Sequence, residues 1–292
     1  MLRIALPNKG RLAEGARGLL EQAGLAFEQR SDRALQANLG SELLALFLRA
    51  RDIPEVVADG AADVGITGRD CLAESGRRLD VALDLGFGRC RLAVAAREES
   101  PVRSAADVAP GARVATSFPR LTRQHFRAAG REVTVVPLSG ATEIAPHLGV
   151  ADLIVDLVST GSTLRTNGLR EIDTVVESTA LLIARPELQR DAAAARRLDQ
   201  LRTALESVLR ARDKRYLMAN VPRAALPAMR DVVPGLMAPT VIDLLDRDGG
   251  VGNGHVAVHA VVDQREVYRV LAELKGLGAE GILVTPIERL MP

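Results

Sequence analysis

The stretch from residue 151 to residue 164 constrains the fold more than any other part of this 292-residue chain. It reads Ala-Asp-Leu-Ile-Val-Asp-Leu-Val and continues at once as Ser-Thr-Gly-Ser-Thr-Leu. A short, mostly apolar run that ends in polar turn residues is typical of a buried strand. The residues from 164 to 169 then resemble the first turn of a helix. We therefore expect a strand, a hydroxyl-rich turn and a helix start in direct succession.

This succession predicts an anion-binding site. Backbone N–H groups at a helix start have no partner within the helix, and the helix dipole favours negative charge there. Gly161 permits close backbone approach, and the hydroxyls of the turn add further hydrogen-bond donors. The alternative interpretation is that the turn is only a helix N-cap with spare hydroxyls.

Asp156 lies near the carboxyl end of the predicted strand, which is the edge where ligands of open α/β sheets bind. A carboxylate beside a phosphate site would repel the phosphate, so it must serve another purpose. It could accept hydrogen bonds from sugar hydroxyls, hold a metal ion or stabilise a developing cation. A phosphorylated sugar is the ligand that satisfies all of these features.

Composition excludes several other functions. With 47% hydrophobic and 26% charged residues, the chain can form two or three globular domains. The formal charge of +1 does not favour a nucleic-acid partner. We find no secretory signal pattern and no apolar run long enough to span a membrane, so we expect a soluble cytoplasmic protein. Small-molecule binding and protein interaction remain as the alternatives to an enzyme.

Two loops near the N-terminus are further candidates for the site. A strand over residues 2–6 is followed by Pro-Asn-Lys-Gly and an amphipathic helix, which places Lys9 at the carboxyl end of the strand. A strand over residues 62–66 is followed by a turn that ends in Asp70. Lys9 could also be a solvated loop lysine, and Asp70 an ordinary first-turn acid of a helix.

The remaining pattern predicts a second α/β lobe and a separate C-terminal module. Strands and helices alternate from residue 91, as in parallel sheets, and a helix over residues 140–148 carries Glu143. An apolar segment over residues 172–184 and a helix over residues 187–212 lead back to the first lobe. The last part has the order βαββαβ of a ferredoxin-like module. Its His255 and His259 share a strand face and are more often structural than metal ligands.

A longer pattern resembles a known family. The signature of ATP phosphoribosyltransferase, the first enzyme of histidine biosynthesis, is matched place by place at Glu143, Gly149, Ala151, Ile154, Asp156, Leu157, Thr160, Gly161, Thr163 and Leu164. The segments Leu-Pro-Asn-Lys-Gly-Arg-Leu at residues 6–12 and Gly-Ile-Thr-Gly-Arg-Asp at residues 65–70 are also similar to the family. The likeness runs the whole length of the chain and includes an extension that resembles the regulatory domain of the family's long form.

The resemblance implies a fold and its domains. The expected fold is α/β, with a two-lobed core like that of type II periplasmic-binding proteins and a C-terminal ferredoxin-like regulatory domain. Residues 1–90 with 177–212 would form catalytic lobe I, residues 91–176 catalytic lobe II, and residues 213–292 the regulatory domain. Homo-oligomers, dimers that assemble into hexamers, are implied as well.

The resemblance also implies a reaction. N1 of the adenine of ATP attacks C1 of phosphoribosyl pyrophosphate, and pyrophosphate leaves with the help of Mg²⁺, whose ligands the sequence does not identify. Asp156, Glu143 and Lys9 are the expected catalytic residues. The residues expected to bind phosphoribosyl pyrophosphate are Asp156, Ser159, Thr160, Gly161, Ser162, Thr163 and Leu164.

ATP and an inhibitor have expected sites of their own. The residues expected to bind ATP are Lys9, Gly10, Arg11, Arg49, Arg69 and Asp70, with Arg33 as a further candidate for the adenine pocket. Histidine, the implied inhibitor, would bind at Asn220, Thr240 and Gly281. Two rival hypotheses are a small-molecule sensor without catalysis and a catalytically weak paralogue that serves as a regulatory subunit.

Overall fold

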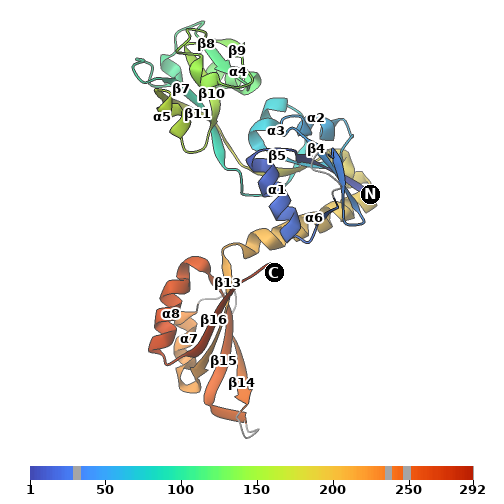
Figure 1. Cartoon of the computed structure of the whole chain (residues 1–292), viewed down its shortest axis with the longest axis vertical. Coiled ribbons are helices and arrows are strands. Elements are labelled where there is room, and N and C mark those ends of the chain that lie inside the picture. The colour runs from blue at the N-terminus through green and yellow to red at the C-terminus, as the bar shows by residue number, and fades with distance from the viewer. Residues whose placement is uncertain (29–33, 234–238, 246–250, 292) are drawn as a thin grey trace. The chain divides into compact units, whose positions relative to one another are not determined.

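The computed structural model describes residues 1–28, 34–233, 239–245 and 251–291 (Figure 1). The chain divides into two compact units, Met1–Arg202 and Thr203–Pro292. Arg33 lies outside the described residues. In the part of the chain that is described, no helix combines the length and the apolar character needed to cross a membrane.

The first sheet of unit 1 has the strand order β2-β3-β4-β1-β5-β12-β6, and we call the part built on it lobe I. Its strands are β1 (Leu2–Pro7), β2 (Phe27–Glu28), β3 (Gln36–Leu39), β4 (Leu43–Leu48), β5 (Val64–Gly68), β6 (Asp80–Asp84) and β12 (Ala180–Ala184). Its helices are α1 (Arg11–Gln22), α2 (Ile53–Ala58) and α3 (Arg69–Ser75). Strands β4, β1 and β5 run parallel, so the loops that follow them meet at one edge of the sheet.

The second sheet has the order β11-β7-β10-β8-β9, and we call the part built on it lobe II. Its strands are β7 (Cys90–Arg97), β8 (Arg113–Thr116), β9 (Thr134–Pro137), β10 (Leu153–Val158) and β11 (Leu169–Ser178). Its α-helices are α4 (Pro119–Ala128) and α5 (Ser162–Thr166), and its 3₁₀ turns are η1 (Ala105–Asp107) and η2 (Thr142–Ile144). Strands β8, β9 and β10 are parallel, as the alternating pattern predicts.

The chain passes between the lobes twice. It enters lobe II between β6 and β7 and returns between β11 and β12, and β7 and β11 pair so that Cys90 lies opposite Ser178. Two α/β lobes joined by crossing strands confirm the expected core of the type II periplasmic-binding-protein kind. The predicted apolar segment 172–184 covers parts of β11 and β12, which belong to different sheets.

Two predicted helices differ from the observed ones. The helix predicted over residues 140–148 is wrong, because the structure has only the 3₁₀ turn η2 there. Ala141 adopts a left-handed conformation with φ of 50°, and Pro146 has no N–H to donate to a helix. The helix predicted over residues 187–212 is split into a 3₁₀ segment, η3 (Pro186–Arg190), and α6 (Ala192–Ala211). The carboxylate of Asp191 accepts the N–H groups of Ala193 and Ala194, and so it caps α6.

Unit 2 contains the predicted βαββαβ order. Its elements are β13 (Lys214–Pro222), η4 (Arg223–Ala225), α7 (Leu226–Val232), β14 (Thr240–Leu245), β15 (Val251–Asp263), η5 (Gln264–Glu266), α8 (Val267–Gly276) and β16 (Glu280–Pro286). The antiparallel sheet has the order β14-β15-β13-β16. Alternate residues of β13 and β15 form a buried core with Val270 and Leu274 of α8. Because the side-chain period of a strand is two, the intervening residues lie on the opposite face of the sheet.

Candidate functional site

The predicted strand, turn and helix start form one side of a cavity of about 270 Å³. The apolar side chains of β10 alternate into the core of lobe II, and its last residues lead directly into the turn and α5. Gly161 has a φ of 73°, a left-handed conformation in which glycine is not strained. The residues that line the cavity are Arg11, Glu143, Asp156, Leu157, Val158, Ser159, Thr160, Gly161, Ser162, Thr163 and Leu164. All predicted binding residues for phosphoribosyl pyrophosphate therefore border one cavity, which we call the loop cavity.

The hydroxyls of the turn are close together and exposed at the loop cavity. Thr160 Oγ1 and Ser162 Oγ lie 3.0 Å apart, and both side chains are exposed. Thr163 is also exposed, whereas Leu164 is buried and anchors α5 in the core of lobe II. The first N–H groups of α5 have no partner inside the helix. The loop cavity thus offers hydroxyl and backbone donors on a fixed support.

Asp156 is held from two sides at the edge of this cavity. Thr142 Oγ1 donates a hydrogen bond to one carboxylate oxygen, and the N–H of Leu157 donates to the other at 2.7 Å. Burial raises the pKa of Asp156 above its ordinary value. The two hydrogen bonds oppose this rise, and the nearby carboxylate of Glu143 adds to it. The loop cavity therefore contains a fixed carboxylate with a neighbouring second one.

Thr142 was not predicted from the sequence. It is buried in η2, next to Glu143, and it forms the hydrogen bond that orients Asp156. Thr142 lies inside the helix predicted over residues 140–148, where nothing in the local sequence points to a contact with Asp156. Arg91 was also missed. Its guanidinium pairs with the carboxylate of Glu171 at 2.6 Å and contacts the backbone oxygen of Ser159 at 3.5 Å, so it supports the turn from the side of β7.

Lobe I reaches the loop cavity through Arg11. Arg11 is the first residue of α1, and its Nη2 donates to Ser159 Oγ at 2.6 Å. Gly10 precedes it with a φ of 77°, which lets the chain turn sharply from the β1 loop into α1. A guanidinium thus faces the hydroxyl-rich turn from the opposite lobe.

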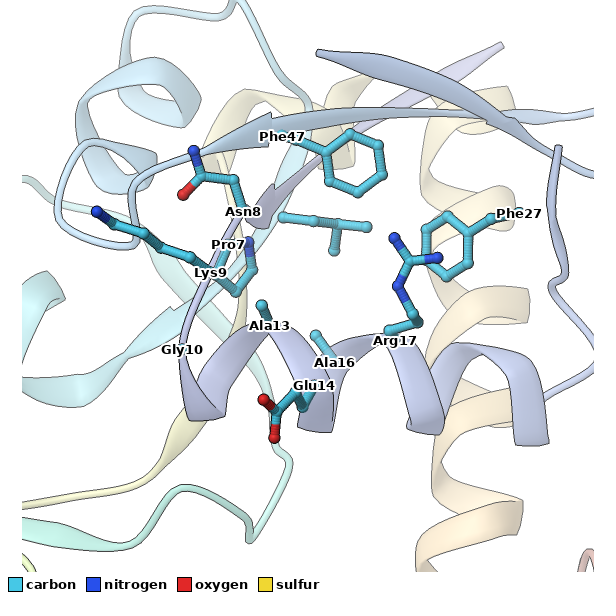
Figure 2. A pocket seen from close by; sticks show the side chains of 11 residues that line it. Pro7, Asn8, Lys9, Gly10, Ala13, Glu14, Ala16, Arg17, Phe27 and Phe47 are labelled. Carbon is cyan, nitrogen blue, oxygen red and sulfur yellow. The ribbon is translucent and has the colours of Figure 1, made fainter. Parts of the chain in front are cut away.

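Lys9 and Gly10 line a second cavity of about 270 Å³ that begins beside α1 (Figure 2). Its other walls include the side chains of Phe27 and Phe47, and the guanidinium of Arg17 stacks 4.5 Å from the ring centre of Phe27. In Figure 2, the amine of Lys9 points away from the two phenylalanine rings. Lys9 and Arg11, predicted as neighbours at phosphates, therefore line different cavities.

The other residues predicted to bind ATP follow β4 and β5. Arg49 is exposed directly after β4. Arg69 pairs with Asp84 at 3.1 Å. Asp70 is buried at the start of α3, where it accepts a hydrogen bond from Ser178 Oγ of β11 at 2.5 Å. Asp70 is therefore bonded to a crossing strand, while both arginines lie at the sheet edge; the assignment of all three to ATP stays a prediction.

The predicted histidine-binding residues lie on the sheet of unit 2. The pairing of β13, β15 and β14 places Asn220 opposite Ala257 and Thr240 opposite His259, so both share the face away from the helices. A Cβ on Gly281 would lie 3.3 Å from Nδ2 of Asn220, which brings these two positions together. Thr240 is on β14, at the edge of the sheet.

One of the two strand histidines, His259, has a hydrogen-bond partner on the same sheet. The phenol of Tyr216 is hydrogen-bonded to Nδ1 of His259. Over the described ranges of the chain, no group of three or more histidine, cysteine, aspartate or glutamate side chains is placed to hold a metal ion.

Comparison with known proteins gives a consistent result over the whole chain. A family model described as ATP phosphoribosyltransferase matches residues 49–207, and one described as HisG, C-terminal domain, matches residues 211–289. The chain is 60% identical to ATP phosphoribosyltransferase of Gemmatimonas aurantiaca, with 100% of both chains covered. It is 49% identical to that of Halorubrum lacusprofundi, with 99% of this chain and 100% of the relative covered.

A solved structure is similar in fold. It is that of the ATP phosphoribosyl transferase (HisG:HisZ) complex from Thermotoga maritima, with a TM-score of 0.62 and 29% identity. The match covers 70% of this chain and 99% of the other. The solved chain therefore matches about as many residues of this chain as unit 1 contains.

Proposed function

The chain belongs to the ATP phosphoribosyltransferase family, and on this premise we propose how its residues carry out the transfer of a phosphoribosyl group to ATP. In this reaction N1 of the adenine attacks C1 of phosphoribosyl pyrophosphate, and pyrophosphate leaves to give N1-(5-phosphoribosyl)-ATP. The observation that carries the assignment of roles is the loop cavity, in which Asp156, the hydroxyl-rich turn and Arg11 of the other lobe meet.

The turn from Ser159 to Leu164 binds the 5-phosphate of phosphoribosyl pyrophosphate. Hydroxyls and unpaired N–H groups supply the donors that a phosphate needs, and they stand on the rigid end of β10. Arg11 adds a positive charge from lobe I at Ser159. Because donors come from both lobes, binding of this substrate favours an arrangement in which the lobes stay together.

Asp156 and Glu143 act on the ribose. Adenine N1 is unprotonated at neutral pH, so the reaction requires no strong general base. What it requires is placement of the two substrates and stabilisation of a ribose that develops positive charge at C1. An ionised Asp156, fixed by Thr142 and Leu157, is suited to face that charge, and Glu143 is suited to accept hydrogen bonds from the ribose hydroxyls.

Mg²⁺ fits the chemistry of these donors. Hard carboxylate oxygens are what Mg²⁺ binds in proteins, usually together with substrate phosphates and water, and the carboxylate of Glu143 in the loop cavity would supply them. When bound, Mg²⁺ neutralises charge on the pyrophosphate. Lys9, in the loop after β1, adds a positive charge that also neutralises the pyrophosphate.

ATP is assigned to the edge of lobe I. Lys9, Gly10, Arg11, Arg49, Arg69 and Asp70 are the proposed binding residues. Arg49 and Arg69 follow the parallel strands β4 and β5, so they lie at the edge where such sheets bind ligands. The buried Asp70 supports this edge through Ser178 rather than by presenting a free carboxylate.

Unit 2 is proposed to bind histidine as a feedback inhibitor, at the face that carries Asn220, Thr240 and Gly281. The match of residues 211–289 to the C-terminal domain of the family supports this role. Inhibition would be allosteric, through a change in how subunits are arranged in homo-oligomers from dimer to hexamer. We place the reaction in the cytoplasm, which supplies both ATP and phosphoribosyl pyrophosphate.

A turnover assay tests the proposed function. The purified chain is mixed with ATP, phosphoribosyl pyrophosphate, Mg²⁺ and pyrophosphatase, and the ultraviolet change of N1-substituted adenine is followed with and without histidine. A signal that histidine suppresses supports catalysis and regulation together. A signal that ignores histidine supports the enzyme but contradicts the role of unit 2. Ligand binding without turnover would favour the sensor or the regulatory subunit.

A further inference from the structure

Helix α4 of lobe II is capped by a carboxylate that comes from α3. The first α4 residue is Pro119, which has no N–H, and the N-cap residue Phe118 provides no side-chain hydrogen bond. The N–H groups of Arg120 and Leu121 instead donate to the two oxygens of Glu74, at 2.8 and 2.9 Å. One side chain of α3 therefore satisfies two N–H groups at the start of α4.

The contact is reciprocal. The last α3 residues lead into Gly76, which ends the helix in a left-handed conformation. The guanidinium of Arg120 lies against Gly76, so that a Cβ there would be 2.3 Å from Nη1. The helix dipole favours an acid near a helix start and a base near a helix end. Glu74 lies near the end of α3 and Arg120 near the start of α4, so each charge is unfavourable for its own helix and favourable for the other. Glu74 and Arg120 are thus placed to stabilise the other helix, not their own.

Helix α3 is shared by the two lobes. Leu72 packs on the hydrophobic cluster of lobe I that contains Ile53 and Leu181. The next residue, Ala73, packs on the cluster of lobe II that contains Phe118 and Leu121. The side chain of Asp70 is bonded to the crossing strand β11 through Ser178. A change in the angle between the lobes would therefore act on α3 and on the contact at its end.

Both helices are attached to parts of the active site. Helix α3 follows β5 directly and begins with Arg69 and Asp70, which are assigned to ATP. Helix α4 follows β8, whose Thr116 lies opposite Val155 of β10, the residue before Asp156. The contact between Glu74 and α4 thus connects the two sheet edges that carry the binding residues.

We propose that Glu74 and Arg120 form an interlobe clasp that positions the two halves of the active site, so that Arg11 of lobe I reaches Ser159 of lobe II. The inference rests on the proposed function. Neither residue touches a substrate; both are positioning residues. Without the clasp, the arrangement that binds substrate becomes only one of several. The apparent dissociation constant is then the intrinsic one divided by the fraction of molecules in the binding arrangement. Saturating substrate restores that arrangement, so turnover at saturation stays close to that of the wild type.

The kinetic signature follows from this argument. Glu74→Ala raises KM for phosphoribosyl pyrophosphate and for ATP by roughly tenfold, while kcat changes by less than about threefold. Glu74→Gln keeps one acceptor oxygen and has a smaller effect, and it is the variant to use if Glu74→Ala does not fold. Arg120→Ala adds less in the double variant than alone, because both residues serve one contact. Asp191→Ala is the control, since it also removes a carboxylate that caps a helix through two N–H groups, but Asp191 bridges no lobes.

Amide hydrogen exchange separates positioning from plain stability. In the wild type, phosphoribosyl pyrophosphate slows exchange at Thr163 and Leu164 in lobe II and at Ala13 and Glu14 in lobe I. In the Glu74 variants, exchange at Arg120 and Leu121 becomes faster, protection of the lobe II amides stays, and protection of the lobe I amides is lost.

The possible failures are distinguishable. If the substrate does not protect Thr163 and Leu164 in the wild type, the proposed function fails. The clasp is overturned if the substrate protects the lobe II amides, protects the lobe I amides equally in the wild type and in both Glu74 variants, and leaves both KM values unchanged in these variants. A KM effect of the same size in Asp191→Ala would also overturn it, because loss of any helix cap would then suffice.

Discussion

The guanidinium of Arg11, at the start of α1, donates a hydrogen bond to Oγ of Ser159 at 2.6 Å. The two residues belong to different lobes and lie far apart in the sequence, yet they border the same cavity. A charge from lobe I thereby completes a set of donors that lobe II supplies.

Arg11→Ala is expected to lower kcat/KM by roughly 100-fold, because it removes the positive charge at Ser159 that we propose faces the bound phosphate. Arg11→Lys keeps the charge but not the planar donor pair, and a smaller loss is expected. Steady-state kinetics with varied phosphoribosyl pyrophosphate measures both. Arg127→Ala, an exposed arginine of α4, is the control. Equal kcat/KM in Arg11→Ala and the control would remove Arg11 from the site.

Thr142→Val tests the orientation of Asp156. The hydrogen bond from Thr142 lowers the pKa of Asp156 and so opposes the effect of burial. Its loss raises that pKa further, and the ionised form, which we propose as the catalytic one, is then populated only at higher pH. The acidic limb of the kcat/KM profile should shift to higher pH, and kcat/KM at neutral pH should fall about fivefold, the value of one hydrogen bond.

The control for this shift is Thr134→Val, an exposed threonine on β9 of the same lobe. Its pH profile should superimpose on that of the wild type. An acidic limb that does not move in Thr142→Val would mean that the hydrogen bond to Asp156 does not govern the protonation that limits the rate.

The sequence predicts the strand, turn and helix start because these features are local. An apolar run, a glycine that must adopt positive φ and a hydroxyl-rich turn can all be read within a few residues of Gly161. The roles of Thr142 and Arg91 cannot be predicted from the local sequence in this way. Their roles depend on η2 and β7 being placed beside β10 by the sheet order, a non-local property. The helix predicted around Glu143 failed for a local reason, the left-handed Ala141 together with Pro146.

The sheets and the C-terminal module were predictable from alternation, whereas the interlobe contacts were not. Glu74 has the pattern of a solvated acid in a short helix, and only the packing of α3 on α4 shows that it caps another helix. Asp70 likewise has the pattern of a first-turn acid in an active-site loop, but burial and Ser178 make it part of the connection to β11.

Thr163→Val should weaken phosphoribosyl pyrophosphate more than ATP. The exposed hydroxyl of Thr163 borders the loop cavity, and valine has the same shape without the donor. A rise in KM of roughly fivefold for phosphoribosyl pyrophosphate, with KM for ATP unchanged, is expected. Thr166→Val, on the same helix but outside the cavity lining, is the control. Equal weakening of both substrates would argue against a dedicated phosphate site.

Asp63→Asn tests a buried ion cluster that supports lobe I. Burial alone would raise the pKa of Asp63, but hydrogen bonds and charge from Arg3 and Arg185 outweigh it and lower that pKa. The carboxylate therefore stabilises the fold above its ordinary pKa of 3.8, and the contribution is lost as the pH falls below this value. At neutral pH the variant should lose roughly 2–4 kcal/mol in urea unfolding.

For comparison, Asp199→Asn breaks an exposed pair with Arg202 on α6, and a loss below about 0.5 kcal/mol is expected. The gap between the two variants should close at acidic pH. If Asp63→Asn is as stable as Asp199→Asn at neutral pH, the cluster contributes no net stability.

A chain that ends at Arg212 should keep its turnover and lose its response to histidine. The shortened chain retains all of unit 1 and α6. The match to the similar Thermotoga maritima chain covers 99% of that chain but only 70% of this one. Turnover of the shortened and full-length chains at increasing histidine concentration measures this. Full inhibition of the shortened chain would place the histidine site outside unit 2.

The most direct test of the account is the turnover of Asp156→Asn with bound phosphoribosyl pyrophosphate. The substitution removes the charge that we propose faces C1 of the ribose, and it preserves the size of the side chain. We expect kcat to fall at least about 100-fold while the dissociation constant of phosphoribosyl pyrophosphate changes by less than about threefold. Asp152→Asn, an exposed residue immediately before the same strand, should behave as the wild type. A kcat within about twofold of the wild type in Asp156→Asn would contradict the central role given to this carboxylate.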